Sequence, residues 1–342
     1  MVWFLASKPK LCIAAFNSFG SIVPEPSVSK RLKASRISSI SSSLRKYPNL
    51  YFYDGKYYEV LTTDDFRFYL FKKVYLASDN VIDTFRDRVV ISSINGIKAR
   101  LLLLREWLER EKPDVIGLQE LKADNNKLEK NMFADLGYSF IYNGQKSYNG
   151  CAILSKYETK NTSFFFPGNE HDPQRRWISA EINGILFCNL YLPNGNPLGT
   201  EKFQYKINWM KLLYNYIREL RSLGKPIIIM GDFNVIPQEI DCKSPQKWKN
   251  DALFDKQVRS IFFKILNLGF YDALRLKTSQ SNIYTQWDYQ AGAWQQNEGV
   301  RIDHFLLNPL AVDKLISFGL DKYMRSKDRP SDHIPIWIII DK

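Results

Sequence analysis

The sequence of 342 residues has no apolar stretch near the roughly 18 to 20 residues that a membrane-spanning helix needs. Its longest aliphatic runs are short ones, such as residues 101–104 and 227–230. We therefore expect neither a membrane-spanning segment nor a membrane partner.

Cysteine is also scarce. The four cysteines lie far apart in the chain, with no CxxC pair and no histidines at the spacing of a zinc site (Cys12, Cys151, Cys188 and Cys242). This pattern predicts a protein of a reducing compartment, without disulfide bonds or structural zinc.

Acidic residues are almost missing from the first 50 positions, which hold eight basic residues, one acid (Glu25) and many serines. Such a composition is typical of an organelle transit peptide. The alternatives are a disordered tail or an upstream stretch that a misassigned start codon adds. A secretory signal is not expected, because no positive segment precedes a clean apolar core.

The rest of the composition is that of a globular protein, with 45% apolar and 25% charged residues. The length favours one large α/β domain with an appendage. The formal net charge is +12, which favours a polyanionic partner such as nucleic acid or a phospholipid surface. Residues 1–86 carry 13 basic and 7 acidic residues and so half of this excess. The main body is only mildly basic.

Residues 49–77 are rich in aromatic side chains, with ten in all. An Asp54-Gly55 pair separates two β-prone runs there, which predicts a small β-hairpin ahead of the main domain. We assign residues 1–86 to this basic, serine-rich leader with its possible hairpin, and residues 87–342 to the main domain.

From residue 88 onward, short β-prone runs alternate with helical patterns, as in an α/β protein. Helices are expected at residues 97–112, 202–223 and 255–268. The first should bury Leu101, Leu104, Trp107 and Leu108. Strands are expected at residues 89–91, 115–118, 152–154, 177–182, 185–191, 226–230, 302–307 and 336–340.

Ionisable residues stand at the ends of several buried runs, where functional groups of layered α/β proteins gather. They are Glu120, Asp232 with Asn234, Asp303, and Asp332 with His333. Alone, Glu120 could be a helix N-terminal acid and Asp303 an ion-pair partner. Asp232 and Asn234 are two residues apart on an extended chain and so share one face. Together these oxygen-rich groups are the ligands that Mg²⁺ or Mn²⁺ prefers, beside an imidazole able to contact phosphate.

Seven ordered motifs then make the sequence resemble the exodeoxyribonuclease III family of abasic-site endonucleases, within the endonuclease/exonuclease/phosphatase superfamily. The resemblance covers about residue 87 to residue 342. The motifs are SINGIKAR (93–100), PDVIGLQE (113–120), GQKSYNGCA (144–152), YLPNG (191–195), GDFNVIP (231–237), WDY with RID (287–289 and 301–303), and SDHIP (331–335).

The resemblance implies an α/β fold: a four-layered α/β sandwich of two packed mixed β-sheets flanked by helices, as in DNase I, with an N-terminal extension. It also implies roles for individual residues. Tyr191 and His333 would contact the scissile phosphate, and Asp303 would hold His333. Asp232 would activate water or protonate the leaving oxygen, and Asn234 would orient it. The implied metal group is Glu120 as principal ligand, Asn95, Ser93, Asp232, Asn234, Asp332 and His333.

Basic and aromatic segments resemble the DNA-facing parts of this family, and the implied DNA-binding residues are Lys146, Tyr148, Arg175, Arg176, Trp287 and Trp294. An ordinary surface with buried tryptophans is the alternative. Two positions depart from the family: Ser93 replaces a usual asparagine, which predicts a weakened site, and Gln286 stands where a tryptophan is frequent. His304 should face away from Asp303 and be structural.

The resemblance therefore predicts a Mg²⁺- or Mn²⁺-dependent monomer that cuts double-stranded DNA 5′ to abasic sites and trims 3′ ends. The alternatives are a phosphatase of the same fold acting on a small or lipid phosphoester, and a weakened DNA-binding relative. The resemblance looks bacterial, so we expect a cytoplasmic protein, or a mitochondrial one if the leader is a transit peptide.

Overall fold

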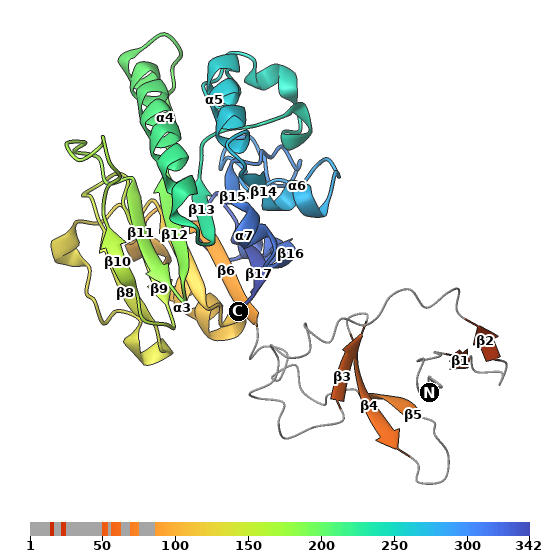
Figure 1. Cartoon of the computed structure of the whole chain (residues 1–342). Coiled ribbons are helices and arrows are strands. Elements are labelled where there is room, and N and C mark those ends of the chain that lie inside the picture. Colours follow the sequence, from red (N-terminus) through yellow and green to blue (C-terminus); the bar gives the residue numbers. More distant parts are fainter. Residues whose placement is uncertain (1–13, 17–21, 25–49, 54–55, 63–68, 75–85) are drawn as a thin grey trace. The chain divides into compact units, whose positions relative to one another are not determined.

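The computed structural model describes residues 14–16, 22–24, 50–53, 56–62, 69–74 and 86–342. The chain divides into two compact units, Met1–Thr84 and Phe85–Lys342, whose elements are labelled in Figure 1. No helix of the described residues is long and apolar enough to cross a membrane.

The first unit contains two small antiparallel sheets. β1 (Ala14–Phe16) pairs with β2 (Ile22–Pro24), and β3 (Leu50–Tyr53), β4 (Lys56–Thr62) and β5 (Tyr69–Val74) form a sheet in that order. Tyr53 pairs with Lys56, so the hairpin expected around Asp54-Gly55 is confirmed. The two turn residues and the serine-rich stretch 27–46 lie outside the described residues. The third strand, β5, was not expected.

Two six-stranded mixed sheets form the second unit. The first has the order β16-β17-β6-β7-β9-β8, and its bounds are β6 (Arg86–Ser93), β7 (Val115–Gln119), β8 (Ser139–Asn143), β9 (Cys151–Ser155), β16 (Leu315–Leu320) and β17 (Ile336–Asp341). The second has the order β10-β11-β12-β13-β15-β14, with β10 (Lys160–Ser163), β11 (Trp177–Ile182), β12 (Ile185–Tyr191), β13 (Ile227–Asp232), β14 (Tyr271–Asp272) and β15 (Asp303–Leu307). Each sheet has one parallel pair, β6 with β7 and β12 with β13.

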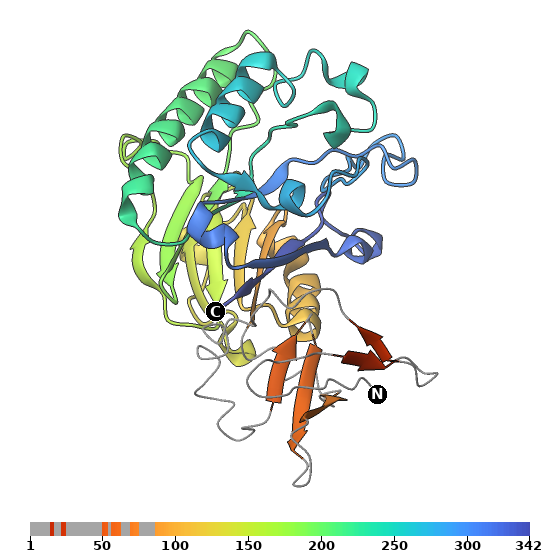
Figure 2. The ribbon, with the colours of Figure 1, turned by 45° about the vertical axis from the view of Figure 1, so that its right-hand side comes forward.

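The core between the sheets is apolar because alternate residues of each strand point to the same face. Ile91 and Ile153 from the first sheet pack there with Phe187, Met230 and Phe305 from the second. Outside this core, α3 (Ile97–Glu111) covers the first sheet, and α4 (Glu201–Leu220) and α5 (Lys256–Leu266) cover the second. The predicted four-layered sandwich is confirmed (Figure 2).

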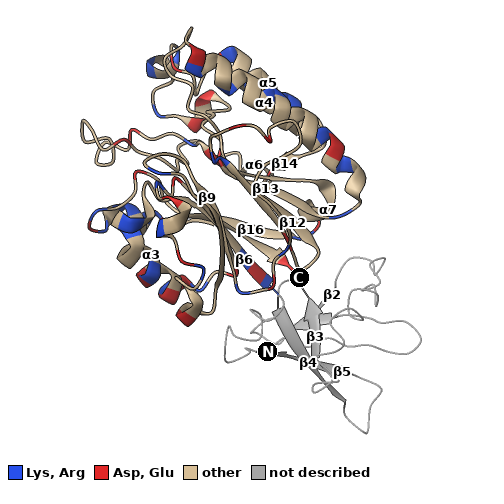
Figure 3. Ribbon diagram, turned by 90° about the vertical axis from the view of Figure 1, so that its left-hand side faces the viewer, with Lys and Arg blue, Asp and Glu red and all other residues tan. Residues whose placement is uncertain are grey.

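Charged residues lie mainly on the outward faces of these helices, while the strands are largely uncharged (Figure 3). The expected burial on α3 holds for Leu104, Trp107 and Leu108, whereas Leu101 is only partly buried. α5 begins after Asp255, whose carboxylate accepts hydrogen bonds from two backbone N–H groups of the first turn. The remaining helices are short: α6 (Ala273–Lys277), α7 (Pro309–Val312), and the 3-10 helices Asn125–Lys127, Ala134–Leu136, Arg221–Leu223, Glu239–Asp241, Pro245–Trp248 and Lys322–Ser326.

Strand pairing brings the predicted strand-end residues to one edge of the sandwich. Tyr191 at the end of β12 pairs with Asp232 at the end of parallel β13. Asp232 pairs in turn with Asp303, which begins antiparallel β15. In the other sheet, Ser93 ends β6 beside Gln119, the residue before Glu120. Residues more than 100 positions apart in the chain therefore meet at this edge.

Candidate active site

Asp232, Asp303 and His333 form a buried group at this edge of the sandwich. The ring nitrogen Nδ1 of His333 lies 2.8 Å from Oδ2 of Asp303, and Nε2 lies 3.8 Å from Oδ2 of Asp232. One carboxylate thus orients the imidazole, and the opposite ring nitrogen faces the second carboxylate. Among the described residues, this is the one group of three or more histidine, cysteine, aspartate or glutamate side chains close enough together to hold a metal ion.

The charges in this group are strongly coupled. Burial alone would lower the pKa of His333, but Asp303 and then Asp232 raise it well above its ordinary value, so the imidazole is a cation at neutral pH. Burial also raises the pKa of Asp232 well above its usual range, against the opposing charge of His333. Asp232 is therefore a stronger base than an exposed aspartate, and His333 is a buried hydrogen-bond donor.

Glu120 directly follows β7 of the first sheet, Tyr191 ends β12 of the second, and the two side chains contact each other directly. The Tyr191 hydroxyl donates a hydrogen bond to Oε1 of Glu120, and Nζ of Lys122 lies 3.0 Å from Oε2 of the same carboxylate. Burial, followed by the charge of Glu120, raises the pKa of Tyr191 well above its ordinary value. The phenol therefore keeps its proton. The sequence interpretation missed Lys122, which lies two residues after Glu120, the last residue of its motif.

Asn95 and Asp332 are joined by a 2.9 Å hydrogen bond from Nδ2 of Asn95 to Oδ1 of Asp332. Lys122 donates to Oδ1 of Asn95 over 2.6 Å, which links this pair to Glu120. Burial would raise the pKa of Asp332, but the charge of His333 and hydrogen bonds from Asn95 and Gln286 hold it below its ordinary value. Asp332 is thus a carboxylate at neutral pH.

Asn234 is fixed beside Asp232 by three hydrogen bonds. Its backbone N–H donates to Oδ1 of Asp232 over 2.9 Å, and its Nδ2 donates to the carbonyl of Leu192 over 2.9 Å. Nδ2 of Asn194 lies 3.3 Å from Oδ1 of Asn234. Asn194 belongs to the YLPNG motif but was not among the predicted site residues. These hydrogen bonds hold the side-chain amide of Asn234 in one orientation beside the Asp232 carboxylate.

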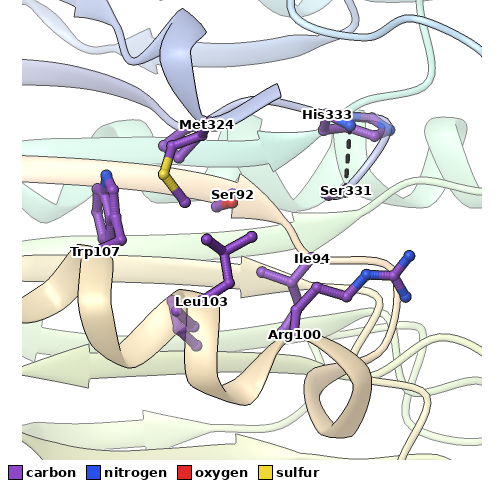
Figure 4. A pocket seen from close by; sticks show the side chains of 10 residues that line it. Ser92, Ile94, Arg100, Leu103, Trp107, Met324, Ser331 and His333 are labelled. Carbon is purple, nitrogen blue, oxygen red and sulfur yellow. Dashed lines mark hydrogen bonds between the residues drawn. The ribbon is translucent and has the colours of Figure 1, made fainter. Parts of the chain in front are cut away.

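Ser93 is completely buried, and its Oγ has no hydrogen-bond partner among the described residues. Its carbonyl accepts a 2.6 Å hydrogen bond from Oγ of Ser331. A cavity of about 30 Å³ lies nearby on the α3 side of β6, lined by Ser92, Arg100, Trp107, Met324, Ser331 and His333 among others (Figure 4). A space of this size has room for about two water molecules.

The predicted DNA-binding residues divide into exposed and buried ones. Lys146, Arg175 and Tyr148 are exposed, with Tyr148 70% accessible. Arg176 instead packs over the Tyr191 ring, 4.8 Å from its centroid, and donates to the Tyr191 carbonyl. Arg176 therefore holds Tyr191 in place through its ring face and its backbone carbonyl.

Direct DNA contact by Trp287 does not fit the structure, because this side chain is fully buried and its indole N–H donates to Asn297. Trp294 packs edge-on against it, with ring centroids 4.8 Å apart, and is only partly exposed. The exposed aromatic residue of this loop is Tyr289, which is 50% accessible. Its hydroxyl lies 3.4 Å from Nδ2 of Asn95 and 3.1 Å from Nη2 of Arg100.

The donor groups at this edge suit a hard divalent cation, because carboxylate and amide oxygens predominate. Asp232, Asp303 and His333 offer ligand atoms within 4.8 Å of one another. Oδ1 of Asp303 is buried without a hydrogen-bond partner among the described residues. This edge could therefore hold a metal ion.

Buried carboxylates around a cationic histidine, on a sandwich of two mixed sheets, define a hydrolase of phosphoesters. Residues 92–333 match the Endonuclease/Exonuclease/phosphatase family. The chain belongs to this family, and within it to the exodeoxyribonuclease III enzymes. It is a hydrolytic nuclease.

Individual relatives agree with this assignment. Exodeoxyribonuclease III of Haemophilus influenzae is 32% identical over 257 residues, which are 72% of this chain and 96% of the relative. An AP endonuclease from Archaeoglobus fulgidus is 35% identical, with a TM-score of 0.72 over 75% of this chain and 99% of that one. The 3′ phosphatase NExo from Neisseria, solved with a product DNA hairpin, is 33% identical, with a TM-score of 0.73 over 75% of this chain and all of that one.

Proposed function

We propose that this DNA-repair phosphodiesterase cuts duplex DNA on the 5′ side of abasic sites and removes blocking groups and nucleotides from 3′ ends. The observation that carries the proposal is the buried Asp232–His333–Asp303 group beside the Glu120–Tyr191 pair. Relatives named AP endonuclease and 3′ phosphatase, both about one third identical, support the two activities.

His333 is the group that binds the phosphate in this proposal. Asp303 holds Nδ1, so Nε2–H points away from Asp303 and toward the space beside Asp232. A phosphate oxygen accepting from Nε2 becomes more negative as water attacks, and the imidazolium stabilises that charge. The Tyr191 hydroxyl keeps its proton. In this proposal it exchanges its hydrogen bond to Glu120 for one to the same phosphate and becomes the second donor.

Asp232 is the base in this proposal. Its raised pKa suits removal of a proton from the attacking water. Asn234, whose orientation is fixed by Leu192 and Asn194, offers an amide that aligns the same water. The leaving oxygen of the sugar lies opposite the attacking water and takes its proton from solvent.

A divalent cation, Mg²⁺ or Mn²⁺, would be held by Glu120, Asn95 and Asp332, with Ser93, Asp232 and Asn234 as the other candidates. His333 could join them only after losing its Nε2 proton. When bound, the cation supplies positive charge to the phosphate oxygens. The mutual hydrogen bonds of Asn95, Asp332 and Lys122 place oxygen donors close together, which supports this assignment.

The DNA surface of the proposal consists of exposed Lys146, Tyr148 and Arg175, with partly exposed Trp294 and, newly, Tyr289. Lysine and arginine suit the phosphates of duplex DNA, and the aromatic rings suit the gap that a missing base leaves. We also propose that the enzyme acts as a monomer, because the proposed groups all come from one chain.

The decisive experiment uses two labelled duplexes, one with a single abasic-site analogue and one with a 3′-phosphate at a nick. Each is incubated with the full chain in Mg²⁺, Mn²⁺ or EDTA. We expect cutting 5′ to the lesion and release of the 3′-phosphate with metal only. Asp232→Asn should lower both rates by at least about 100-fold, while the exposed control Asp313→Asn should match the wild type.

Failure of the folded wild type to cut either duplex would refute the proposal. Release of 3′-phosphate without incision would restrict it to 3′-end processing, and full activity of Asp232→Asn would refute the role of Asp232. The same assay tests the proposed domain boundary, which the family match to residues 92–333 supports. A chain shortened to residues 87–342 should keep both activities.

A further inference from the structure

Lys206 is a lysine on the apolar face of α4 and is completely buried. Its Nζ donates hydrogen bonds to two backbone carbonyls, that of Asn194 over 2.9 Å and that of Asn234 over 2.6 Å. No carboxylate lies within 4.0 Å of this ammonium among the described residues, so its close partners are these carbonyls.

The two carbonyls belong to the two loops that carry the amides of the candidate active site. One loop follows β12 and Tyr191, and the other follows β13 and Asp232. Asn234 has a φ of 47°, a left-handed conformation that asparagine adopts more readily than other residues except glycine. The contacts of the Asn234 carbonyl and amide then decide where this turn places the side chain.

We infer that Lys206 is a positioning residue of the nuclease: its ammonium clamps the Asn194 and Asn234 carbonyls and so holds the amide of Asn234 beside Asp232. The side chains of Asn194 and Asn234 meet at 3.3 Å, and this contact needs both loops in place. Lys206 makes no hydrogen bond and no ion pair with Asp232 or His333. Its hydrogen bonds therefore act on the site through Asn194 and Asn234.

The burial of Lys206 supports a dedicated role. Removing an ammonium from water is costly unless hydrogen bonds compensate. Burial lowers the pKa of Lys206 to about 7, although Asp251 and Asp232 oppose the shift. An apolar residue would fill this face of α4 at no such cost, as Met210 does one turn further along.

Gly195 provides the space for this side chain. A Cβ at position 195 would lie 2.5 Å from Cδ and 3.1 Å from Cβ of Lys206, and 3.3 Å from Cβ of Ala252, so a larger residue would press chiefly on the lysine. Gly199 lies in the same loop and also has a positive φ, 74° against 88° for Gly195, but a Cβ there would meet nothing within 4 Å. The two glycines therefore separate displacement of Lys206 from backbone strain.

The first test is Lys206→Met in the full chain, with Lys225→Met as the matched control, since Lys225 is partly exposed and paired with Glu181. We expect kcat for cutting abasic duplex to fall about 10- to 100-fold, because a small misplacement of a reacting group costs that much. KM should change less than about twofold, because the DNA surface is untouched. The control should match the wild type.

Hydrogen–deuterium exchange provides a readout that does not depend on activity. In Lys206→Met, backbone amides of residues 192–196 and 233–237 should exchange about tenfold faster, while those of α5 keep their rates. The inference rests on the proposed function only for the rate assay. If the wild type cuts no tested duplex, the proposed function fails, and the exchange data still decide the role of Lys206.

Gly195→Ala and Gly199→Ala keep the inference testable if Lys206→Met does not fold. Gly195→Ala should reproduce the loss of kcat and the faster local exchange, and Gly199→Ala should not. The inference is overturned if exchange in both loops stays within about twofold of the wild type, if KM rises as much as kcat falls, or if both glycine variants behave alike.

Discussion

His304 lies directly after Asp303 of the candidate active site and allows a quantitative prediction about acid stability. Its ring is buried, with Nδ1 2.8 Å from Nη1 of Arg301 and Nε2 3.0 Å from the carbonyl of Val235. The carbonyl requires a proton on Nε2, and the guanidinium requires Nδ1 to accept. The expectation that His304 is structural agrees with these contacts.

Burial, followed by the Arg301 charge, lowers the pKa of His304 from 6.5 to about 4. The folded protein therefore keeps the ring neutral at pH 5, while the unfolded chain protonates it. The stability linked to this group is present above pH 6.5 and is lost as the pH falls toward 4. With these two pKa values, the free energy of unfolding should drop by about 2 kcal/mol between pH 7 and pH 5.

The assay compares urea unfolding of the wild type and of His304→Gln at pH 7, 6 and 5. Glutamine can still donate to the Val235 carbonyl but does not titrate. The variant should be less stable than the wild type at pH 7. Between pH 7 and pH 5, its free energy of unfolding should fall by about 2 kcal/mol less than that of the wild type. The chain has three histidines in all, and exposed His171→Gln is the control. Equal losses in wild type and His304→Gln, within about 0.5 kcal/mol, would refute the reasoning.

Three further variants probe the site and its support. Ser93→Asn should raise the rate of cutting about 3- to 10-fold, because the longer amide side chain can gain one hydrogen bond in the buried site. An unchanged rate would exclude Ser93 as the cause of a weakened site. Tyr191→Phe removes the hydroxyl that contacts Glu120; kcat should fall about 100-fold with unfolding unchanged, and an equal rise in KM would instead indicate a binding role. Asp241→Asn replaces a buried carboxylate that Arg301 and Arg275 contact at 2.6 and 2.5 Å. Its free energy of unfolding in urea should be about 3 to 5 kcal/mol lower than that of the wild type. A difference under about 1 kcal/mol would mean that this network adds little to stability.

Local patterns in the sequence were sufficient for the helices and most of the catalytic side chains. The expected helices begin and end within three residues of α3, α4 and α5, because apolar periodicity and a capping aspartate act over a few residues. Asp232, Asp303 and His333 could be named because charged residues next to buried strands are unusual. Lys206 also left a signal, since it interrupts the apolar face of α4 four residues before Met210.

Tertiary structure alone decided which of these groups meet. The pairing of β13 with β15 places Asp232 opposite Asp303, which are 71 positions apart, and no local pattern encodes that distance. It also decided exposure: Trp287 is buried and Tyr289 is exposed although both lie in one motif, because loop residues do not alternate as strand residues do.

The sequence by itself thus determined the elements, the chemical groups and the family, since these depend on residue type and short-range order. The coupled charges of His333 and Asp232, the Tyr191–Glu120 contact and the carbonyl clamp of Lys206 depend on distances between distant segments. Electrostatic and hydrogen-bond energies fall steeply with such distances. Only the packing of the two sheets sets them.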